Sequence, residues 1–290
     1  MRAVIDENLR DFAAATLPWL EREPVLNNVF CTLIAERLEG SVPLEDGCLW
    51  VRVQDTDGLV GVALRTPPFE LLVSALSAEA AVAIADVLAG HDLPGVRGIE
   101  AGTSAFVPAW CARTGAHAER TMAQRMYQLD TVIPPVGVPG RLRPATGDDA
   151  PLAAAWSHAF HDEAIGAGHV SSVRDDRIHG WVAQGIVWLW DVDGTPVSMA
   201  MARPSAVLLP RVSLVYTPPE HRRRGYGAAG VAALSQHLLD TGARGCMLFT
   251  DLANPTSNSV YQRIGYRPAA DADVWRFMGR SRTGGQLGGG

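Results

Sequence analysis

A repeated spacing of three and four between hydrophobic residues predicts a helix over residues 6–23. The residues on its apolar face are Leu9, Phe12, Ala13, Thr16, Leu17 and Leu20. Pro24 breaks this pattern, because proline lacks the amide hydrogen that a helix interior needs. A second helix is predicted to follow and to stop at Gly40, a residue suited to a helix C-terminal cap.

The hydrophobic period then changes from helical spacing to the alternation expected of strands. Residues 48–54 and 59–65 flank the sequence DTDG, which predicts a β-hairpin. Strands and helices then alternate as far as residue 129. We expect strands at 69–76, 95–101 and 118–129, a helix at 78–90 with Ser77 as its N-terminal cap, and a helix at 104–115.

Residues 130–144 carry four prolines and two glycines with little periodicity, which makes them the best candidate for a linker. After them the plan of the first half appears again, with a helix that starts at Asp148 or Asp149 and a hairpin around the sequence DVDG. The other expected elements are strands at 186–190, 195–202, 211–217, 244–252 and 270–278, and helices at 226–242 and 256–265.

The two halves therefore look like an internal duplication. Asp57-Gly58 in the first hairpin matches Asp193-Gly194 in the second, and Gly115 matches Gly265 further along. The separation between matched residues grows between these two points, so the second half contains a segment that the first half lacks. The added segment is the one that holds the sequence PPEHRRRGYG.

Composition limits the class of protein. The 290 residues suggest about one to two domains, and the net charge of −6 argues against general nucleic-acid binding. The N-terminus has no apolar core of signal-peptide type, and no apolar run approaches bilayer length. Four widely spaced cysteines show no metal-ligand spacing and are expected to be reduced. We expect a soluble, cytoplasmic protein that binds no metal, membrane or nucleic acid.

The sequence VYTPPEHRRRGYG, residues 215–227, concentrates positive charge between prolines and glycines. Pro218 and Pro219 cannot donate backbone hydrogen bonds, so the strand before them should leave its neighbour and expose amides to an extended ligand. Gly225 and Gly227 let the chain approach a ligand closely, and the helix that follows directs free N–H groups to the same place. Together these features predict a binding site for a pyrophosphate, next to a strand whose backbone can hydrogen-bond the amides of a ligand.

On the loop alone, a solvated surface segment is an equally good interpretation. Two familiar phosphate motifs are excluded, because no GxxxxGK followed by Ser or Thr occurs and the loop does not fit GxGxxG. Nucleic-acid binding by the arginines is disfavoured, because no stripe of aromatic and basic residues accompanies them.

The loop resembles the acetyl-CoA loop of the GNAT N-acetyltransferase superfamily, whose motif is R/Q-x-x-G-x-G/A. Arg222, Gly225 and Gly227 fill its fixed positions. Residues 254–266 resemble the family's N-x-x-A/S-x-x-x-Y-x-x-x-G-F/Y helix, matched by Asn254, Ser257, Tyr261, Gly265 and Tyr266. The resemblance covers residues 141–280. In the first half it is weak and rests on element order and on the separation between matched residues.

This resemblance implies an acetyl-CoA-dependent N-acetyltransferase in which a primary amine attacks the thioester directly. Backbone groups of Val215, Tyr216 and Thr217 would pair with the pantetheine arm, and a strand amide near Val215 or Tyr216 could polarise the thioester carbonyl. Tyr261 would protonate the leaving thiolate as general acid, and Asn254 would touch the cofactor near its pantetheine. The pyrophosphate would be held by Arg222, Arg223, Arg224, Gly225, Tyr226, Gly227 and Ala228.

Each of these residues also has a purely structural interpretation. Tyr261 could be a core tyrosine, Asn254 could be a helix cap, and Tyr216 and Tyr226 could serve only in packing. His221, which follows Glu220, could be a base but is expected to be solvated.

The general base is missing from the pattern, because the strand 211–217 contains no carboxylate. The acceptor pocket could be lined by His158, His161, Asp162 and Glu163, although each also suits the surface.

The predicted fold class is α/β (α+β), with two tandem GNAT-like domains, each a mixed, mainly antiparallel sheet flanked by helices. Residues 1–136 are predicted to be a degenerate copy, because Ser104 and Cys111 stand where the second half has Asn254 and Tyr261. Residues 137–280 are predicted to be catalytic, and residues 281–290 to be a flexible tail. The alternatives are a mycothiol-synthase-like acetyltransferase and an acyl-CoA-binding regulator without turnover. The sequence does not indicate the acceptor amine or the oligomeric state.

Overall fold

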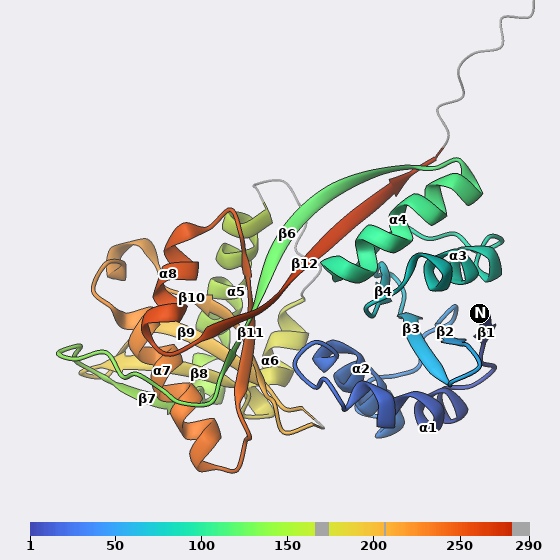
Figure 1. Ribbon diagram of the computed structural model, residues 1–290. Helices are drawn as coiled ribbons and strands as arrows, with labels where there is room; N and C mark the ends of the chain where they lie inside the picture. The colour runs from blue at the N-terminus through green and yellow to red at the C-terminus, as the bar shows by residue number, and fades with distance from the viewer. Residues whose placement is uncertain (166–173, 206, 280–290) are drawn as a thin grey trace, which may run out of the picture. The chain divides into compact units, whose positions relative to one another are not determined.

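The structure is a computed structural model that describes residues 1–165, 174–205 and 207–279 (Figure 1). The predicted tail, residues 281–290, lies outside the described residues. Two compact units are present. The first contains Met1–Arg125 and the described residues from Ala270 onward, and the second contains Met126–Ala269. The chain thus returns to the first unit at its end, whereas the sequence analysis divides it once, at residue 136.

The first unit is built on a sheet with the strand order β1-β2-β3-β4-β5-β12-β6. Strands β4 and β5 are parallel, and the pairs β1–β2, β2–β3, β3–β4 and β5–β12 are antiparallel. Its elements are β1 (Arg2–Ile5), α1 (Leu9–Leu20), α2 (Asn28–Leu38), β2 (Leu49–Gln54), β3 (Leu59–Arg65), β4 (Leu71–Val73), α3 (Ala78–Val87), β5 (Gly95–Ile99), α4 (Glu100–Thr114), β6 (His117–Leu129) and the greater part of β12 (Arg267–Met278).

The second unit repeats this plan with the strand order β6-β11-β10-β9-β8-β7. Strands β10 and β11 are parallel, and β7–β8, β8–β9 and β9–β10 are antiparallel. Its elements are β7 (Arg141–Pro144), a 3₁₀ turn (Gly147–Asp149), α5 (Ala150–Ile165), α6 (Asp175–Ala183), β8 (Val187–Val192), β9 (Thr195–Arg203), β10 (Arg211–Tyr216), a second 3₁₀ turn (Pro219–His221), α7 (Tyr226–Asp240), β11 (Cys246–Asp251) and α8 (Pro255–Arg263). The predicted fold class, a mixed and mainly antiparallel sheet flanked by helices in each half, is confirmed.

Strand alternation separates two apolar clusters in the second unit. Ala200 and Ala202 of β9 pack in one cluster with Val231 and Leu234 of α7. Met199 and Met201, the intervening residues, pack in the other cluster with α5 and α6. Because successive strand side chains point to opposite faces, α7 covers one face of the sheet and the α5–α6 pair covers the other.

Three elements are absent from the sequence analysis. Strands β1 and β7 have four residues each, which is too short for an alternating pattern to stand out, and β7 occupies the end of the predicted linker. Helix α6 has nine residues and buries only Ile178 and Val182, so its apolar positions are too few for the helical spacing to stand out.

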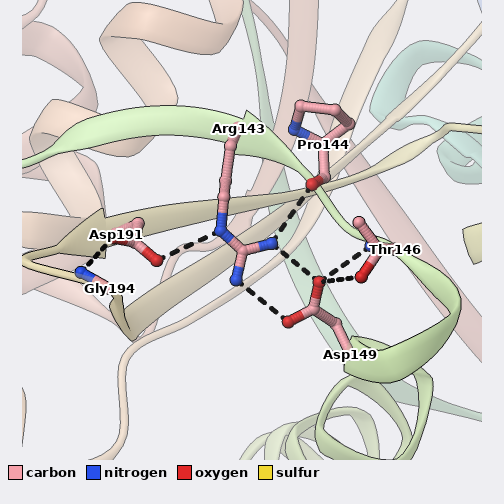
Figure 2. Close-up of polar contacts among 6 residues, drawn as sticks. All are labelled: Arg143, Pro144, Thr146, Asp149, Asp191 and Gly194. Carbon is pink, nitrogen blue, oxygen red and sulfur yellow. Dashed lines mark hydrogen bonds and ion pairs between the residues drawn. The ribbon is translucent and has the colours of Figure 1, made fainter.

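Arg143 of β7 ties three elements of the second unit together (Figure 2). Its Nη atoms donate to the Asp149 carboxylate at 2.7 and 2.9 Å, and its Nε donates to Asp191 at 3.1 Å. The Asp149 carboxylate also accepts from Thr146 N–H at 2.8 Å, and Asp191 accepts from Gly194 N–H at 2.8 Å. The edge strand, the β8–β9 hairpin and the start of α5 are therefore fixed to one guanidinium. The hydrogen bonds from Arg143 lower the pKa of Asp149.

Replacing Asp149 by asparagine is expected to lower the free energy of unfolding by about 1–3 kcal/mol at pH 7, because charge-assisted hydrogen bonds are lost. The depressed pKa in the folded state means that this stabilisation is present above the unfolded pKa near ~4 and is lost as the pH falls. Urea unfolding at several pH values should show the two proteins converging towards pH ~2.

Asp148→Asn removes the same charge from the exposed neighbouring position and serves as the control. An equal loss of stability in that variant would show that net charge, rather than the Arg143 contact, is responsible.

Candidate active site

Strand β10 is paired with its parallel neighbour β11 at a single position, Arg211↔Met247. Its pairing with β9 continues beyond that point but contains a bulge, with a register shift between Ser213 and Tyr216. Leu214, inside the bulge, has a φ of 50°. A bulge leaves backbone groups of the ladder unpaired and bends the strand. Strands β10 and β11 of the second unit therefore part after the start of β10, since their described pairing does not continue beyond Arg211↔Met247.

The separation of the strands is predicted by the sequence, but its cause lies elsewhere. The sequence analysis assigns it to Pro218 and Pro219, whereas the structure places it earlier, at the bulge around Leu214. Sequence patterns do not reveal this bulge, because the residue at positive φ is a leucine and not a glycine.

The loop after β10 leads into a helix with an open N-terminus. Arg223 has a φ of 62° and Gly225 a φ of 81°, and Gly225 is the N-cap of α7 without a side-chain cap. The first α7 hydrogen bond runs from Ala229 N–H to Gly225 O at 2.9 Å, so the amides of Tyr226, Gly227 and Ala228 precede it. Successive amides of this kind form an anion-binding concavity at the positive end of the helix dipole.

The two loop glycines are fixed by space as well as by conformation. A Cβ added to Gly225 would lie 3.0 Å from Val138 Cγ2, and one added to Gly227 would lie 3.1 Å from Thr217 Oγ1. Side chains at these positions would press against neighbouring protein atoms, so glycine is the residue that fits both positions without rearrangement.

The corresponding place in the first unit is closed. Strands β4 and β5 are paired at three consecutive positions through the last residue of β4, Val73↔Gly98. A Cβ on Gly98 would come within 2.3 Å of Val73 O, so the two strands are in close contact where β10 and β11 part. Helix α3 is capped by Ser77, whose Oγ accepts from Ala80 N–H at 3.2 Å, and it carries Glu79 in its first turn.

Among the three arginines of the loop, Arg222 has its own partners. Its Nη2 lies 2.7 Å from both carboxylate oxygens of Glu163, and its Nε donates to Thr217 O at 2.8 Å. Its guanidinium also lies over the ring of Tyr216 at 5.7 Å. Arg223 and Arg224 are exposed, and the described contacts give their side chains no partner, so a role of these two in binding an anion stays a prediction.

Val215 and Tyr216, two of the residues expected to hold a ligand, are the last two residues of β10, and Thr217 follows them. Tyr216 is buried, and its ring is 6.2 Å from that of Trp156 on α5. Ser198 of β9 fixes this end, because its hydroxyl donates to Tyr216 O at 3.0 Å and lies 2.9 Å from Thr217 Oγ1. Val215 and Ala228 are partly buried against the cluster beneath α7. Tyr226 packs against Trp190, Val197 and Ala229.

Asn254 is the N-cap of α8, where its side-chain oxygen accepts from Ser257 N–H at 3.0 Å. The capping interpretation of this residue is therefore confirmed, while contact with a cofactor stays a prediction. Asn258, which the sequence patterns did not single out, donates from its side chain to the backbone oxygens of Asp251 and Asn254 at 2.9 and 2.8 Å. Its Oδ1 accepts from Tyr127 Oη at 3.0 Å. A polar residue inside a helix is the only sequence signal of this network.

Tyr261 of α8 is 9% exposed and packs in the cluster with Ile264 and Tyr266. The rings of Tyr261 and Tyr266 make an edge contact at 6.0 Å. Burial raises the pKa of Tyr261 to about 12, so its phenol keeps its proton at neutral pH. Its packing role is confirmed, and a role as general acid stays a prediction.

The first unit has no similar constellation at the matched positions. Ser104 lies inside α4, where its hydroxyl donates to Glu100 O at 2.6 Å, and so it cannot cap a helix as Asn254 does. Cys111, matched to Tyr261, is half-buried on the same helix.

The polar residues considered for the acceptor side are distributed over α5. His158 Nε2 lies 2.6 Å from Asp175 on α6, and His161 Nδ1 lies 2.6 Å from Ser157 O. Asp162 is exposed. Only Glu163 reaches the loop, within the described contacts of these four residues. His221 lies against the Tyr226 ring, with its Nδ1 buried and without a partner in the described part of the chain.

Comparison with family models matches residues 147–266 to the acetyltransferase (GNAT) family. These residues form a GNAT-family acetyltransferase domain. The matched region contains the parted strands, the arginine loop and Tyr261, and the resemblance inferred from the two motifs is confirmed. Comparison with curated protein sequences gives no match.

Solved structures extend the GNAT likeness to the whole chain. A Drosophila protein aligns at 12% identity with a TM-score of 0.67, covering 95% of this chain and 98% of its own. A GNAT-family acetyltransferase from Colwellia psychrerythraea aligns at 12% identity with a TM-score of 0.60 over 97% and 100%. A tandem GNAT protein from the clavulanic acid biosynthesis pathway aligns at 13% identity with a TM-score of 0.55 over 96% and 98%. At these identities the likeness shows the fold, which is a tandem GNAT fold.

Over the ranges that the structure covers, no helix is both long enough and apolar enough to cross a bilayer.

Tyr261→Phe removes a tyrosine that is expected to ionise only at high pH, because burial raises its pKa. A pKa raised in the folded state means that the unfolded chain loses this proton first, so the contribution of Tyr261 to stability declines as the pH rises from about 10 to 12. Titration of tyrosinate absorbance in the folded proteins should give a difference between wild type and variant centred near pH 12. A difference centred near pH ~10, the value of a solvated phenol, would contradict the burial that the structure shows.

Proposed function

We propose that the chain is an acetyl-CoA-dependent N-acetyltransferase that moves an acetyl group to a small-molecule primary amine by direct attack on the thioester. The observation that carries the proposal is the combination of parted strands and an uncapped helix in the second unit. β10 and β11 pair only at Arg211↔Met247, and α7 begins at Gly225 without a side-chain cap. A GNAT domain uses such an arrangement for a cofactor that has both amides and phosphates.

The loop supplies the phosphate site in this proposal. The amides of Tyr226, Gly227 and Ala228 and the backbone from Arg222 to Gly225 surround the pyrophosphate, and helix N-termini favour such anions. Arg223 and Arg224 contribute charged side chains, one of them near the 3′-phosphate. Arg222 contributes through its backbone, because its guanidinium is held by Glu163 and Thr217.

The strand supplies the acyl site. Backbone groups of Val215, Tyr216 and Thr217 pair with the amides of the pantetheine arm, as an added strand would. An amide near Val215 or Tyr216 donates to the carbonyl oxygen of the acyl group, where negative charge develops during attack. Asn254 lies at the other side of the arm as the cap of α8. Acetyl-CoA supplies the activated acyl group, and the protein supplies orientation and hydrogen-bond donors.

Tyr261 is the proposed general acid. Its raised pKa keeps the phenol protonated, and a protonated phenol can donate its proton to the thiolate that leaves as the amine attacks. The buried position among Ile264 and Tyr266 fixes the ring.

The first unit, Met1–Arg125 with the described residues from Ala270 onward, is proposed to be a degenerate domain that supports the catalytic second unit, Met126–Ala269. Its closed β4–β5 pair and capped α3 leave no comparable cradle. The comparisons give no observation in favour of a mycothiol-synthase-like reaction or a regulator without turnover.

Release of free thiol from acetyl-CoA over a panel of primary amines tests the proposal. The wild type is expected to turn over at least one amine, and Tyr261→Phe is expected to lower kcat by about 100-fold, because general acid catalysis typically contributes that much or more. Binding of acetyl-CoA by the variant should stay unchanged.

Tyr127→Phe is the matched control, since Tyr127 is a fully buried tyrosine that hydrogen-bonds Asn258 and is not assigned a role in the reaction. Its kcat should stay within about twofold of wild type. Binding of acetyl-CoA without turnover of any amine would favour a regulator, and equal losses in both tyrosine variants would remove Tyr261 from the mechanism.

A further inference from the structure

Glu163 of α5 brings a carboxylate to the end of β10, a strand whose own sequence contains none. It lies in the last described turn of α5, three residues after Phe160 and seven after Trp156, a spacing that places all three on one side of the helix. Trp156 packs against Tyr216 with ring centroids 6.2 Å apart. Tyr216 Oη in turn donates to Glu163 Oε1 at 3.3 Å. The carboxylate therefore lies next to the end of β10, on the face covered by α5.

Arg222 holds this carboxylate in place. Its Nη2 contacts both oxygens of Glu163 at 2.7 Å, while its Nε is fixed to Thr217 O. The guanidinium lies over the Tyr216 ring. A side chain from the phosphate loop thus positions an acidic group from a different element, and both meet at the residue whose backbone is proposed to face the acyl group.

The Glu163 carboxylate keeps room for another donor. An ionised carboxylate has about four lone-pair sites, and the described contacts use one on Oε2 and two on Oε1. Half of the side chain, 49%, is accessible to solvent. Tyr216, which donates to this carboxylate, packs against Trp156, so the open oxygen of Glu163 lies beside an aromatic pair. An ammonium group that reached it would meet a negative charge next to apolar surface.

We propose that Glu163 selects the acceptor, which binds as a protonated amine carried on an aromatic or similarly apolar group and gives up its proton to solvent water before the neutral amine attacks. Arg222 is the positioning residue for Glu163. This inference rests on the proposed function, because it concerns the acceptor side of the same site. When the phosphates of CoA occupy the loop beside Arg222, their negative charge offsets the positive charge of its guanidinium. The amine is therefore expected to bind Glu163 more strongly after CoA has bound.

Calorimetric titration of the full chain saturated with CoA tests this proposal without any acyl transfer. The two probes are 2-phenylethylamine, a cation at neutral pH, and 2-phenylethanol, its uncharged analogue. Wild type is expected to prefer the amine, and Glu163→Gln to weaken amine binding by about tenfold, the factor expected when an ion pair of about 1.4 kcal/mol is lost. Binding of the alcohol should change by less than about twofold.

Two further variants serve as controls. Asp240→Asn removes the same charge at an exposed position near the end of α7 and should leave both probes unaffected. Glu163→Asp keeps the charge and should retain part of the preference for the amine. The KM for 2-phenylethylamine in turnover should rise in Glu163→Gln, while kcat changes less.

The outcomes separate the two proposals. Failure of wild type to bind CoA would overturn the proposed function. Wild type that binds CoA but prefers the alcohol to the amine would overturn the role of Glu163 and leave the proposed function standing. An equal loss of CoA and amine binding in Glu163→Gln would show that Glu163 acts only by holding the loop, which also contradicts the proposal.

Discussion

The bulge at Leu214 is the constraint on which the rest of the site depends. It bends β10 away from β11 after a single pair, and it keeps β10 attached to β9 while doing so. A parallel pair that stayed in register would bury its amides in the ladder. Because the pair opens, the loop that follows can turn back over the gap, and α7 can direct its free amides to the same space.

Two copies of one fold, with and without this opening, show what the bulge contributes. In the first unit, β4 and β5 stay paired to the last residue of β4, and α3 is capped by a serine and followed by an acidic residue. In the second, the strand is bulged and the helix cap is a glycine. The scaffolds agree in element order, so the differences lie in one strand and one turn, where the duplication adds residues.

Local sequence patterns predicted much of this fold because turn chemistry and helical spacing act over few residues. The DVDG hairpin, the Ser77 cap and the Asn254 cap follow from such rules. The return of the last strand to the first unit does not, since strand pairing between distant segments leaves no local signal. The same applies to the bulge at Leu214. The ion pair of Arg222 with Glu163 joins residues far apart in sequence, and no spacing could reveal it.

The central claim is that only the second unit has a cofactor cradle, and calorimetric titration of the full chain with acetyl-CoA measures it directly. The account predicts one molecule bound per chain. It also predicts that Gly227→Trp abolishes this binding, because even a Cβ at residue 227 would lie 3.1 Å from Thr217 Oγ1. Two molecules per chain, or unchanged binding by the variant, would contradict it.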